Sequence, residues 1–178
     1  MQITLKAVAD QTEAERASLR ALTTAVYPAD TPDTEPGPQT VWAAPTWGVL
    51  VHDDSGELAS YVGIHVRDAT VDGQPALIGG IGNVKTHPER RGRGHAQAAL
   101  RRAMTFLADD LGAAFGLLVC RQPLIPFYSQ LGWLPFPGTL LIEQHGTTLP
   151  FTHNTTMLLP LHAPAPHTGT IDLHGLPW

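Results

Sequence analysis

The sequence predicts an α/β (α+β) protein, in which one mixed sheet carries helices on its faces. Short runs that alternate apolar and polar residues indicate strands, and two amphipathic runs between them have helical spacing. Three of the strands follow one another through hairpin turns, whereas a doubly wound parallel sheet alternates one strand with one helix. With 178 residues, 43% of them hydrophobic, the chain can bury the core of a single domain spanning residues 1–178.

The first half of the chain predicts a strand, a helix and a long loop. Residues 2–7 alternate apolar and polar side chains, as a half-buried strand does. Thr12 and Glu15 have the spacing of a capping box, which predicts a helix that runs to about Tyr27. Residues 28–45 hold five of the sixteen prolines and are therefore expected to be loop.

Two hairpin turns, at residues 53–57 and 72–73, predict three consecutive antiparallel strands. These strands are expected at residues 47–52, 58–67 and 76–86. The third contains Gly79, Gly80 and Gly82, although glycine weakens the interior of a strand. Such a run indicates a bulge or the close approach of another chain segment or a ligand.

The second half predicts two further helices and three further strands, so the sheet has about six to seven strands. An apolar stripe predicts a helix from Gly94 to about Asp109, and Gly112 is a suitable stop. The remaining elements are expected at residues 113–120 (strand), 123–131 (short helix), 134–143 and 155–162 (strands). Residues 163–178 form a proline-rich C-terminal tail.

Composition and charge exclude several classes of function. No stretch is apolar and long enough to span a membrane, and no apolar signal segment opens the chain. The single cysteine, Cys120, excludes an internal disulfide and is expected of a cytoplasmic protein. The histidines have no paired metal-ligand spacing, which predicts no metal site.

The net charge of −5 conceals an uneven distribution of charges along the chain. Residues 1–72 hold eleven of the sixteen acidic residues, whereas residues 85–102 hold six basic residues and one acidic residue. This pattern predicts an anion site beside an acidic face that attracts cations. Nucleic acid is excluded as a partner, because the basic cluster is short and lacks interleaved aromatic residues.

The most informative segment, residues 84–96, reads as a strand end, a basic glycine-rich loop and a helix start. Such a junction presents unpaired main-chain N–H groups and the positive end of a helix dipole, which favours a bound phosphate. The segment contains neither a P-loop nor a complete dinucleotide-binding glycine motif. Arg91-x-x-Gly94-x-Ala96 instead resembles the pyrophosphate loop of the GNAT superfamily of acyl-CoA N-acyltransferases.

This resemblance implies a GNAT fold and acetyl-CoA (coenzyme A) as the cofactor. It implies that main-chain N–H groups from Arg91 to Ala96 hold the pyrophosphate, while Val84 and Thr86 pair with the pantetheine arm. The expected cofactor-binding residues are Val84, Lys85, Thr86, Arg91, Gly92, Arg93, Gly94, His95 and Ala96.

A second segment, residues 126–133, resembles the Phe/Leu-Tyr-x-x-x-Gly-Trp/Phe motif of the same superfamily. In many members, this tyrosine protonates the departing coenzyme A thiolate, so Tyr128 is the expected catalytic acid. A tyrosine at this position could instead be packed in the core. Cys120 lacks an identifiable partner base, and we interpret it as a buried structural thiol rather than a nucleophile.

The identity of the general base is left open by the sequence. Many relatives place a glutamate on the strand before the phosphate loop, but the corresponding positions here are Gly82 and Asn83. The remaining candidates are His65, His174, Glu35 and the C-terminal carboxylate of Trp178.

Within the superfamily, the chain most resembles the aminoglycoside 2′-N-acetyltransferases. Tyr-Ser-Gln-Leu-Gly-Trp-Leu-Pro at residues 128–135 is similar to their Tyr-Ala-Ser-Arg-Gly-Trp-Leu-Pro, and the acidic loop at residues 29–35 resembles a segment that meets the cationic sugar. The resemblance implies that Asp30, Glu35 and Trp178 bind substrate. Two acidic positions of those enzymes are occupied by Gly82 and Leu176 here.

The sequence thus predicts a cytoplasmic, acetyl-CoA-dependent N-acetyltransferase that acts on a small primary amine, such as an amino sugar or an aminoglycoside-like cation. The amine would attack the thioester directly, and the protein would be a monomer or a homodimer. Two alternatives are acetylation of a protein or peptide N-terminus, and a non-catalytic domain that binds or sequesters acyl-CoA. An enzyme would release free thiol when the amine is added, whereas a binding domain would not.

Overall fold

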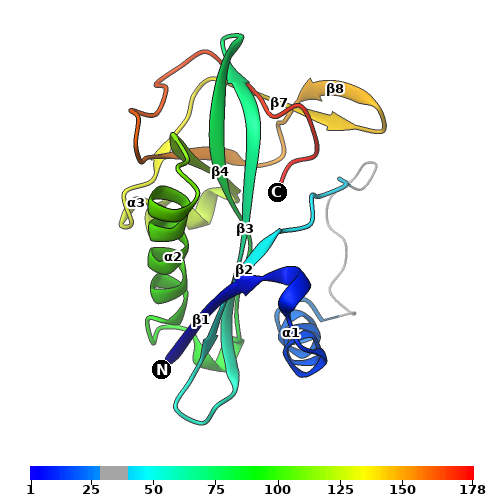
Figure 1. The fold of residues 1–178 in the computed structure, drawn as a ribbon, viewed down its shortest axis with the longest axis vertical. Coiled ribbons are helices and arrows are strands. Elements are labelled where there is room, and N and C mark those ends of the chain that lie inside the picture. The colour runs from blue at the N-terminus through cyan, green and yellow to red at the C-terminus, as the bar shows by residue number, and fades with distance from the viewer. Residues whose placement is uncertain (29–39) are drawn as a thin grey trace.

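The computed structural model describes residues 1–28 and 40–178. A strongly curved sheet forms the centre of the molecule, and helices lie on both of its faces (Figure 1). The helices are α1 (Glu13–Val26), α2 (His95–Thr105) and α3 (Ile125–Ser129). The strands are β1 (Gln2–Ala7), β2 (Trp47–His52), β3 (Leu58–Val71), β4 (Gln74–Thr86), β5 (Phe115–Cys120), β6 (Leu134–Pro135), β7 (Thr139–Gln144), β8 (Thr147–Pro150), β9 (Thr155–Pro160) and β10 (Thr170–Asp172).

The long hairpin of β3 and β4 forms the centre of the sheet. The order of the strands is β6-β9-β5-β4-β3-β10-β7-β8. One edge of β3 pairs with β4 over most of its length. The other edge pairs with β2 near its start and with β10 at its end, and β1 extends the sheet beyond β2. β4 and β5 form a parallel pair in a sheet that is otherwise mostly antiparallel.

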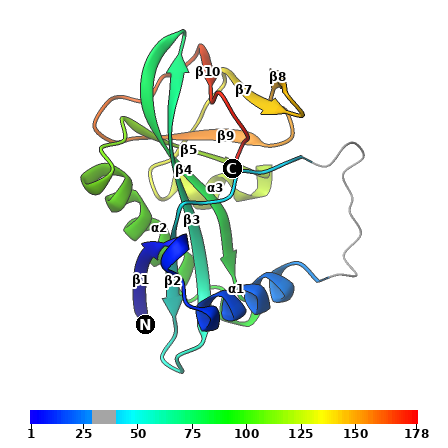
Figure 2. The same cartoon turned by 45° about the vertical axis from the view of Figure 1, so that its right-hand side comes forward.

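Helix α2 covers one face of the sheet (Figure 2). The apolar side of α2 contributes Ala99, Leu100 and Ala103 to a buried cluster with residues from β2, β3, β4 and β5. This stripe has the helical spacing that the sequence showed. A π-helical turn, η3 (Phe106–Asp110), continues α2, and Gly112 follows it with a positive φ of 64°.

Helix α1 and the C-terminal tail cover the opposite face. Thr12 and Glu15 form the predicted capping box at the start of α1, and Leu22 packs with Leu50 and Tyr61 of the sheet. Farther along the same face, Trp178 is buried with 4% of its surface exposed. Successive residues of a strand point to opposite faces, so Gly79 meets Leu107 beyond α2 whereas Gly80 meets Trp178.

The tail is part of the sheet rather than an extension from it. Residues 170–172 form β10, which lies parallel to β7 and antiparallel to the end of β3. The main-chain N–H of Ala43 donates to the carbonyl of Pro177 at 2.7 Å, so residues 40–46 and the tail lie together. Residues 40–45 contain no helix or strand, as the prolines predict.

The predicted α/β class and mixed sheet are confirmed, but the predicted number of strands was too low. The described residues form a ten-stranded sheet. The single strand predicted at residues 134–143 is wrong, because β6 pairs with β9 whereas β7 pairs with β8 and β10. Pro135 and Pro137 lack N–H donors, so a continuous ladder cannot pass through this segment. Strands β8 and β10 were missed, because both are short and lack a clear apolar alternation.

None of the helices in the described residues is long and apolar enough to cross a membrane.

We predict that Gly80→Ala destabilises the fold through Trp178. An alanine Cβ at residue 80 would lie 2.3 Å from Cε2 of the indole, closer than two carbon atoms can approach. The free energy of unfolding should fall by about 1–3 kcal/mol, which is typical of an overpacked core. Chemical denaturation measures this change. The loss should be smaller when Gly80→Ala is made in a Trp178→Ala background, and an equal loss in both backgrounds would contradict the assigned contact.

Candidate active site

Strands β4 and β5 separate near the middle of the sheet. Their parallel register runs from Ile78 opposite Phe115 to Ile81 opposite Leu118, and no pairing between them follows in the described residues. Beyond this point β4 continues to Thr86 and β5 to Cys120. The inner edges of both strands are therefore left without a strand partner.

A β-bulge in β4 accompanies this separation. Tyr61 pairs with Lys85 and Gly63 pairs with Gly82, so two steps along β3 match three steps along β4. The extra residue lies between Gly82 and Lys85, where Asn83 has a φ of +52°. A bulge bends its strand and increases the local twist, and this turns the end of β4 away from β5.

The end of β4 presents main-chain groups to the opening. The carbonyl of Lys85 accepts a hydrogen bond from Ser60 Oγ at 2.8 Å, and the N–H of His87 donates to Ala59 at 2.9 Å, so both are directed to β3. Strand geometry directs the alternate residues, Val84 and Thr86, to the opposite edge. Val84 and Thr86 are half-buried, and an open strand edge of this kind is suited to an extended ligand that carries amides.

The loop after β4 leads directly into α2. Gly92 and Gly94 have φ values of 74° and 81°, and no atom lies within 4 Å of the position of a Cβ on either residue. No side chain caps the N-terminus of α2, at which Gly94 is the N-cap. The N–H of Arg91 already donates to Pro88 at 3.4 Å, so residues 92–96 are left as the donors for an anion.

The basic side chains of this region have different surroundings. Arg91 and Arg93 are exposed, and Arg91 Nε also lies 3.4 Å from the carbonyl of Thr86. Lys85 instead donates to Thr23 Oγ1 of α1 at 3.0 Å, and burial lowers the pKa of its ammonium group. His95 is buried at the first turn of α2. Arg91 and Arg93 are therefore the side chains placed to add positive charge beside the loop.

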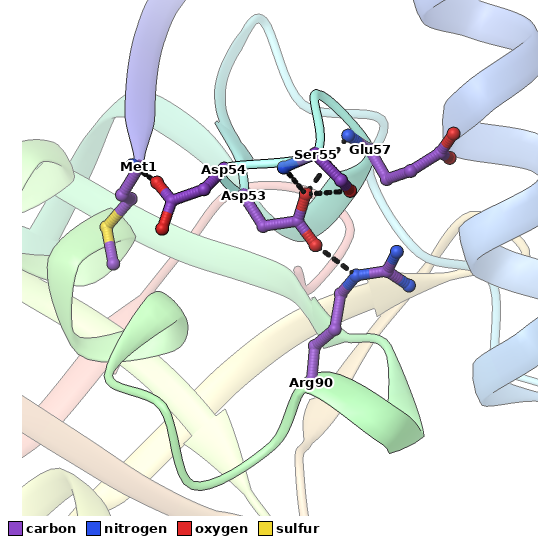
Figure 3. Close-up of polar contacts among 6 residues, drawn as sticks. All are labelled: Met1, Asp53, Asp54, Ser55, Glu57 and Arg90. Atoms are coloured by element: carbon purple, nitrogen blue, oxygen red, sulfur yellow. Dashed lines mark hydrogen bonds and ion pairs between the residues drawn. The ribbon is translucent and has the colours of Figure 1, made fainter.

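The turn between β2 and β3 supports the loop from outside (Figure 3). Asp53 Oδ1 accepts hydrogen bonds from the N–H and hydroxyl of Ser55 and from the N–H of Glu57. Its Oδ2 accepts from Arg90 Nε at 2.5 Å. The Ser55 hydroxyl and then Arg90 hold the pKa of the Asp53 carboxyl well below its usual range. The ionised Asp53 carboxylate therefore stabilises the fold at pH values above the ordinary aspartate pKa. This stabilisation is lost as the pH falls through the lower pKa that Asp53 has in the folded protein.

A cleft of about 540 Å³ lies between this turn and the loop. Residues 53–55 line it on one side, and Glu89, Arg90, Arg93 and His95 line it on the other. The ion pair of Asp53 and Arg90 links this turn to the short 3₁₀ turn η2 (Pro88–Arg90). Because η2 directly precedes the glycine loop, the ion pair helps to fix the position of the loop.

Tyr128 lies on α3, after the end of β5, and 5% of its surface is exposed. Burial raises the pKa of its phenol, and Cys120 and Tyr27 raise it further. These two neighbours belong to the end of β5 and the end of α1, so Tyr128 lies close to the opening between the strands. The phenol stays protonated at neutral pH and can donate a proton.

Cys120 is buried with 4% of its surface exposed, and its thiol donates to Met157 Sδ at 3.5 Å. Burial raises the pKa of the thiol to about 11. A nucleophilic cysteine requires a lowered pKa, so the geometry favours the structural role.

The substrate side is only partly described. Asp30 and Glu35 lie outside the described residues. Trp178 lies across Gly80 and Gly82, with its indole N–H donating to Leu117 at 3.0 Å, and its ring stacks on His65. The structure therefore places Trp178 beside the position at which β4 and β5 separate.

A model of the acetyltransferase (GNAT) domain family matches residues 8–136. The chain belongs to this GNAT family. The matched region includes β4, the glycine loop, α2 and Tyr128. No curated protein matches the sequence significantly.

Several solved structures share this fold at low sequence identity. A GNAT acetyltransferase from Brucella melitensis, crystallised with acetyl-CoA, is 15% identical with a TM-score of 0.58, and the match covers 96% of this chain and 94% of that one. Escherichia coli YhbS, in complex with CoA, is 17% identical with a TM-score of 0.61, covering 98% and 91%. Escherichia coli ElaA is 17% identical with a TM-score of 0.62, covering 89% and 98%.

The sequence analysis assigned no role in the candidate site to three residues that the structure places around it. Asn83 was noted only for not being a glutamate, although glycines around it signalled a bulge. Asp53 was interpreted only as part of a hairpin turn. Arg67 received no role, yet its guanidinium lies 4.9 Å from the Trp178 ring and donates to Leu176 at 2.6 Å. Side-chain contacts over such sequence distances leave no local signal.

We predict that Arg91→Glu weakens acetyl-CoA binding at least tenfold. The substitution places a negative charge beside the proposed pyrophosphate site, where a charge pair at short range is worth about 1–4 kcal/mol. Calorimetry or equilibrium dialysis gives the Kd. Arg101→Glu, an equal charge reversal on an exposed residue of α2, is the control and should leave the Kd within about threefold. Equal affinity of Arg91→Glu and wild type would remove the phosphate-loop assignment.

We also predict that Asp53→Asn weakens acetyl-CoA binding by up to about fivefold, the range of a single ion pair near the surface. Asparagine can still accept the turn hydrogen bonds but leaves Arg90 without its anionic partner. Arg90→Gln should have the same effect, and the double variant should be no weaker than either single variant. Additive losses in the double variant would show that the two residues act separately.

Proposed function

We propose that this GNAT protein transfers an acetyl group from acetyl-CoA to the primary amine of a small molecule. The observation that carries the proposal is the unpaired edge of β4 running directly into an uncapped, glycine-rich helix start. One surface thus offers amide partners, anion donors and positive charge in succession, which fits the amides and phosphates of an acyl-CoA.

The residues of the loop would bind the cofactor at its pyrophosphate, the end remote from the thioester. N–H groups of residues 92–96 would hold the pyrophosphate, with Arg91 and Arg93 beside it, and Val84 and Thr86 would pair with the pantetheine amides. Thr86 and Gly82 are four residue steps apart along the strand, which is about 13 Å of extended chain. The thioester would therefore lie near Gly82, where β4 and β5 separate. Acetyl-CoA supplies, when bound, an activated acetyl group that an amine can attack.

Tyr128 would act as the proton donor to the leaving thiolate. Its phenol is protonated at neutral pH, and α3 places it next to the end of β5. Fixing the acetyl group and the acid in one opening removes much of the entropic barrier to their encounter. Cys120 does not take part, because its buried thiol is neutral.

The proposed acceptor is an amino sugar or an aminoglycoside-like cation. This choice rests on the resemblance of residues 128–135 to the aminoglycoside 2′-N-acetyltransferases and on the acidic residues Asp30 and Glu35. Trp178 would contribute to the floor of the acceptor site. We propose that the protein acts in the cytoplasm.

The direct test is acetyl-CoA-dependent release of free thiol across aminoglycosides, amino sugars, polyamines, amino acids and peptides. Turnover with amino sugars or aminoglycosides supports the proposal. Turnover with peptides alone would indicate that the acceptor is a protein or peptide N-terminus instead. Binding of acetyl-CoA without thiol release would instead indicate a domain that sequesters acyl-CoA.

We predict that Tyr128→Phe lowers kcat about 100-fold or more, because a positioned acid contributes about 10²–10⁴ in rate. The Kd for acetyl-CoA should stay within about twofold, since the phenol hydroxyl holds no part of the proposed cofactor cradle. Steady-state kinetics and calorimetry measure the two values. Tyr61→Phe, which removes another buried phenol hydroxyl, is the matched control and should retain kcat. Undiminished turnover by Tyr128→Phe would exclude the tyrosine as the acid.

A further inference from the structure

His65 lies on β3, on the face of the sheet that the tail covers. It pairs with Gly80 of β4, and only 4% of its surface is exposed. Among the described residues, its Nε2 atom is buried and meets no hydrogen-bond partner. A buried polar atom without a partner is unfavourable, so this nitrogen is placed for a water molecule or a ligand.

This nitrogen lies close to residue 82, whose lack of a side chain lets His65 and Trp178 approach the β4 main chain. A Cβ on Gly82 would lie 3.2 Å from His65 Nε2 and 3.1 Å from the main-chain carbonyl carbon of Trp178. Gly82 is also the residue at which β4 departs from β5. The unpartnered nitrogen therefore lies beside the main chain of residue 82, next to the position where the proposed pantetheine path ends.

One contact positions the imidazole directly, and two more hold the side chain on which it packs. It stacks on the indole of Trp178, with ring centroids 5.3 Å apart and planes inclined by 16°. The indole is itself held by its hydrogen bond to Leu117 and by the Arg67 guanidinium over its ring. The stack on a fixed indole therefore restricts the orientation of the imidazole.

The ring is also uncharged. Burial, and after it the positive charge of Arg67, lowers the pKa of His65 to about 4. In the tautomer that carries its proton on Nδ1, Nε2 has a free lone pair throughout the physiological pH range. An amine nitrogen becomes strongly acidic as it bonds to an acetyl carbon, so even a weak base of this kind can take its proton.

We propose that Nε2 of His65 accepts the proton of the attacking amine, in the place that a carboxylate on β4 would otherwise serve. This inference rests on the proposed acetyl transfer. The amine nitrogen forms a bond to the acetyl carbon while the carbon–sulfur bond breaks. The nitrogen gives its proton to His65, and the departing thiolate takes the phenol proton of Tyr128. Exchange with solvent then restores both side chains.

Of the other candidate bases in the described residues, the carboxylate of Trp178 also lies beside Gly82, whereas His174 is less well placed. His174 is half exposed, and its ring nitrogens already lie 3.1 Å from Thr70 Oγ1 and 3.4 Å from Asp172 Oδ2. It lies in the tail beside Thr70, near the end of β3, rather than beside Gly82. His65 combines burial, a free nitrogen and proximity to the opening.

The test measures kcat and the acetyl-CoA Kd of His65→Gln with the best acceptor of the amine panel. Glutamine has a similar size and can accept a hydrogen bond, but it cannot take a proton at neutral pH. We expect kcat to fall about 100-fold, the contribution of a positioned base, with the Kd within twofold of wild type. His167→Gln, the same change at an exposed histidine, is the control and should keep wild-type kcat.

A second variant separates proton transfer from packing. His65→Ala leaves space for an imidazole, so added imidazole should restore at least a tenth of the lost rate if the ring acts as a base. A His65→Gln enzyme with kcat within threefold of wild type would overturn the inference, as would a His65→Ala enzyme that imidazole does not rescue. A wild-type protein that binds acetyl-CoA but acetylates no amine would instead overturn the proposed function, and with it this role.

Discussion

The separation of β4 from β5 is the feature on which the rest of the site depends. One extra residue in β4, with Asn83 in a left-handed conformation, ends the pairing after Ile81 and Leu118. The sheet loses hydrogen bonds there, but it gains an open edge of main-chain groups in its interior. Because the same strand then enters the glycine loop and α2, the open edge and the anion donors form one continuous surface.

On the opposite face of the same strand, two glycines leave room for other side chains to pack against the main chain. Gly80 and Gly82 point away from α2, and the space above them is taken by the Trp178 indole and approached by the His65 imidazole. Arg67 holds this arrangement through the indole ring and the carbonyl of Leu176. The tail thus serves as part of the floor beside the opening, and a side chain on either glycine would displace it.

The sequence predicted the parts of this structure that have local signals. The capping box of Thr12, the helix after Gly94 and the strand–loop–helix junction all depend on neighbouring residues, and each was found where it was expected. The β10 strand and the ion pair of Asp53 with Arg90 depend on residues far apart in the chain. No periodicity or spacing records such contacts, so they required the structure. The predictions of the cofactor and of the acid rest on motif resemblance, because residue spacing alone could not supply them.

The central claim is that an acyl-CoA occupies the gap between β4 and β5, and a crystal structure of the protein with acetyl-CoA tests it most directly. The pyrophosphate should accept hydrogen bonds from the N–H groups of residues 92–96, and the pantetheine amides should pair with Val84 and Thr86. The acetyl group should lie beside Gly82. A cofactor bound elsewhere, or a pantetheine arm that leaves the β4 edge unpaired, would contradict the claim.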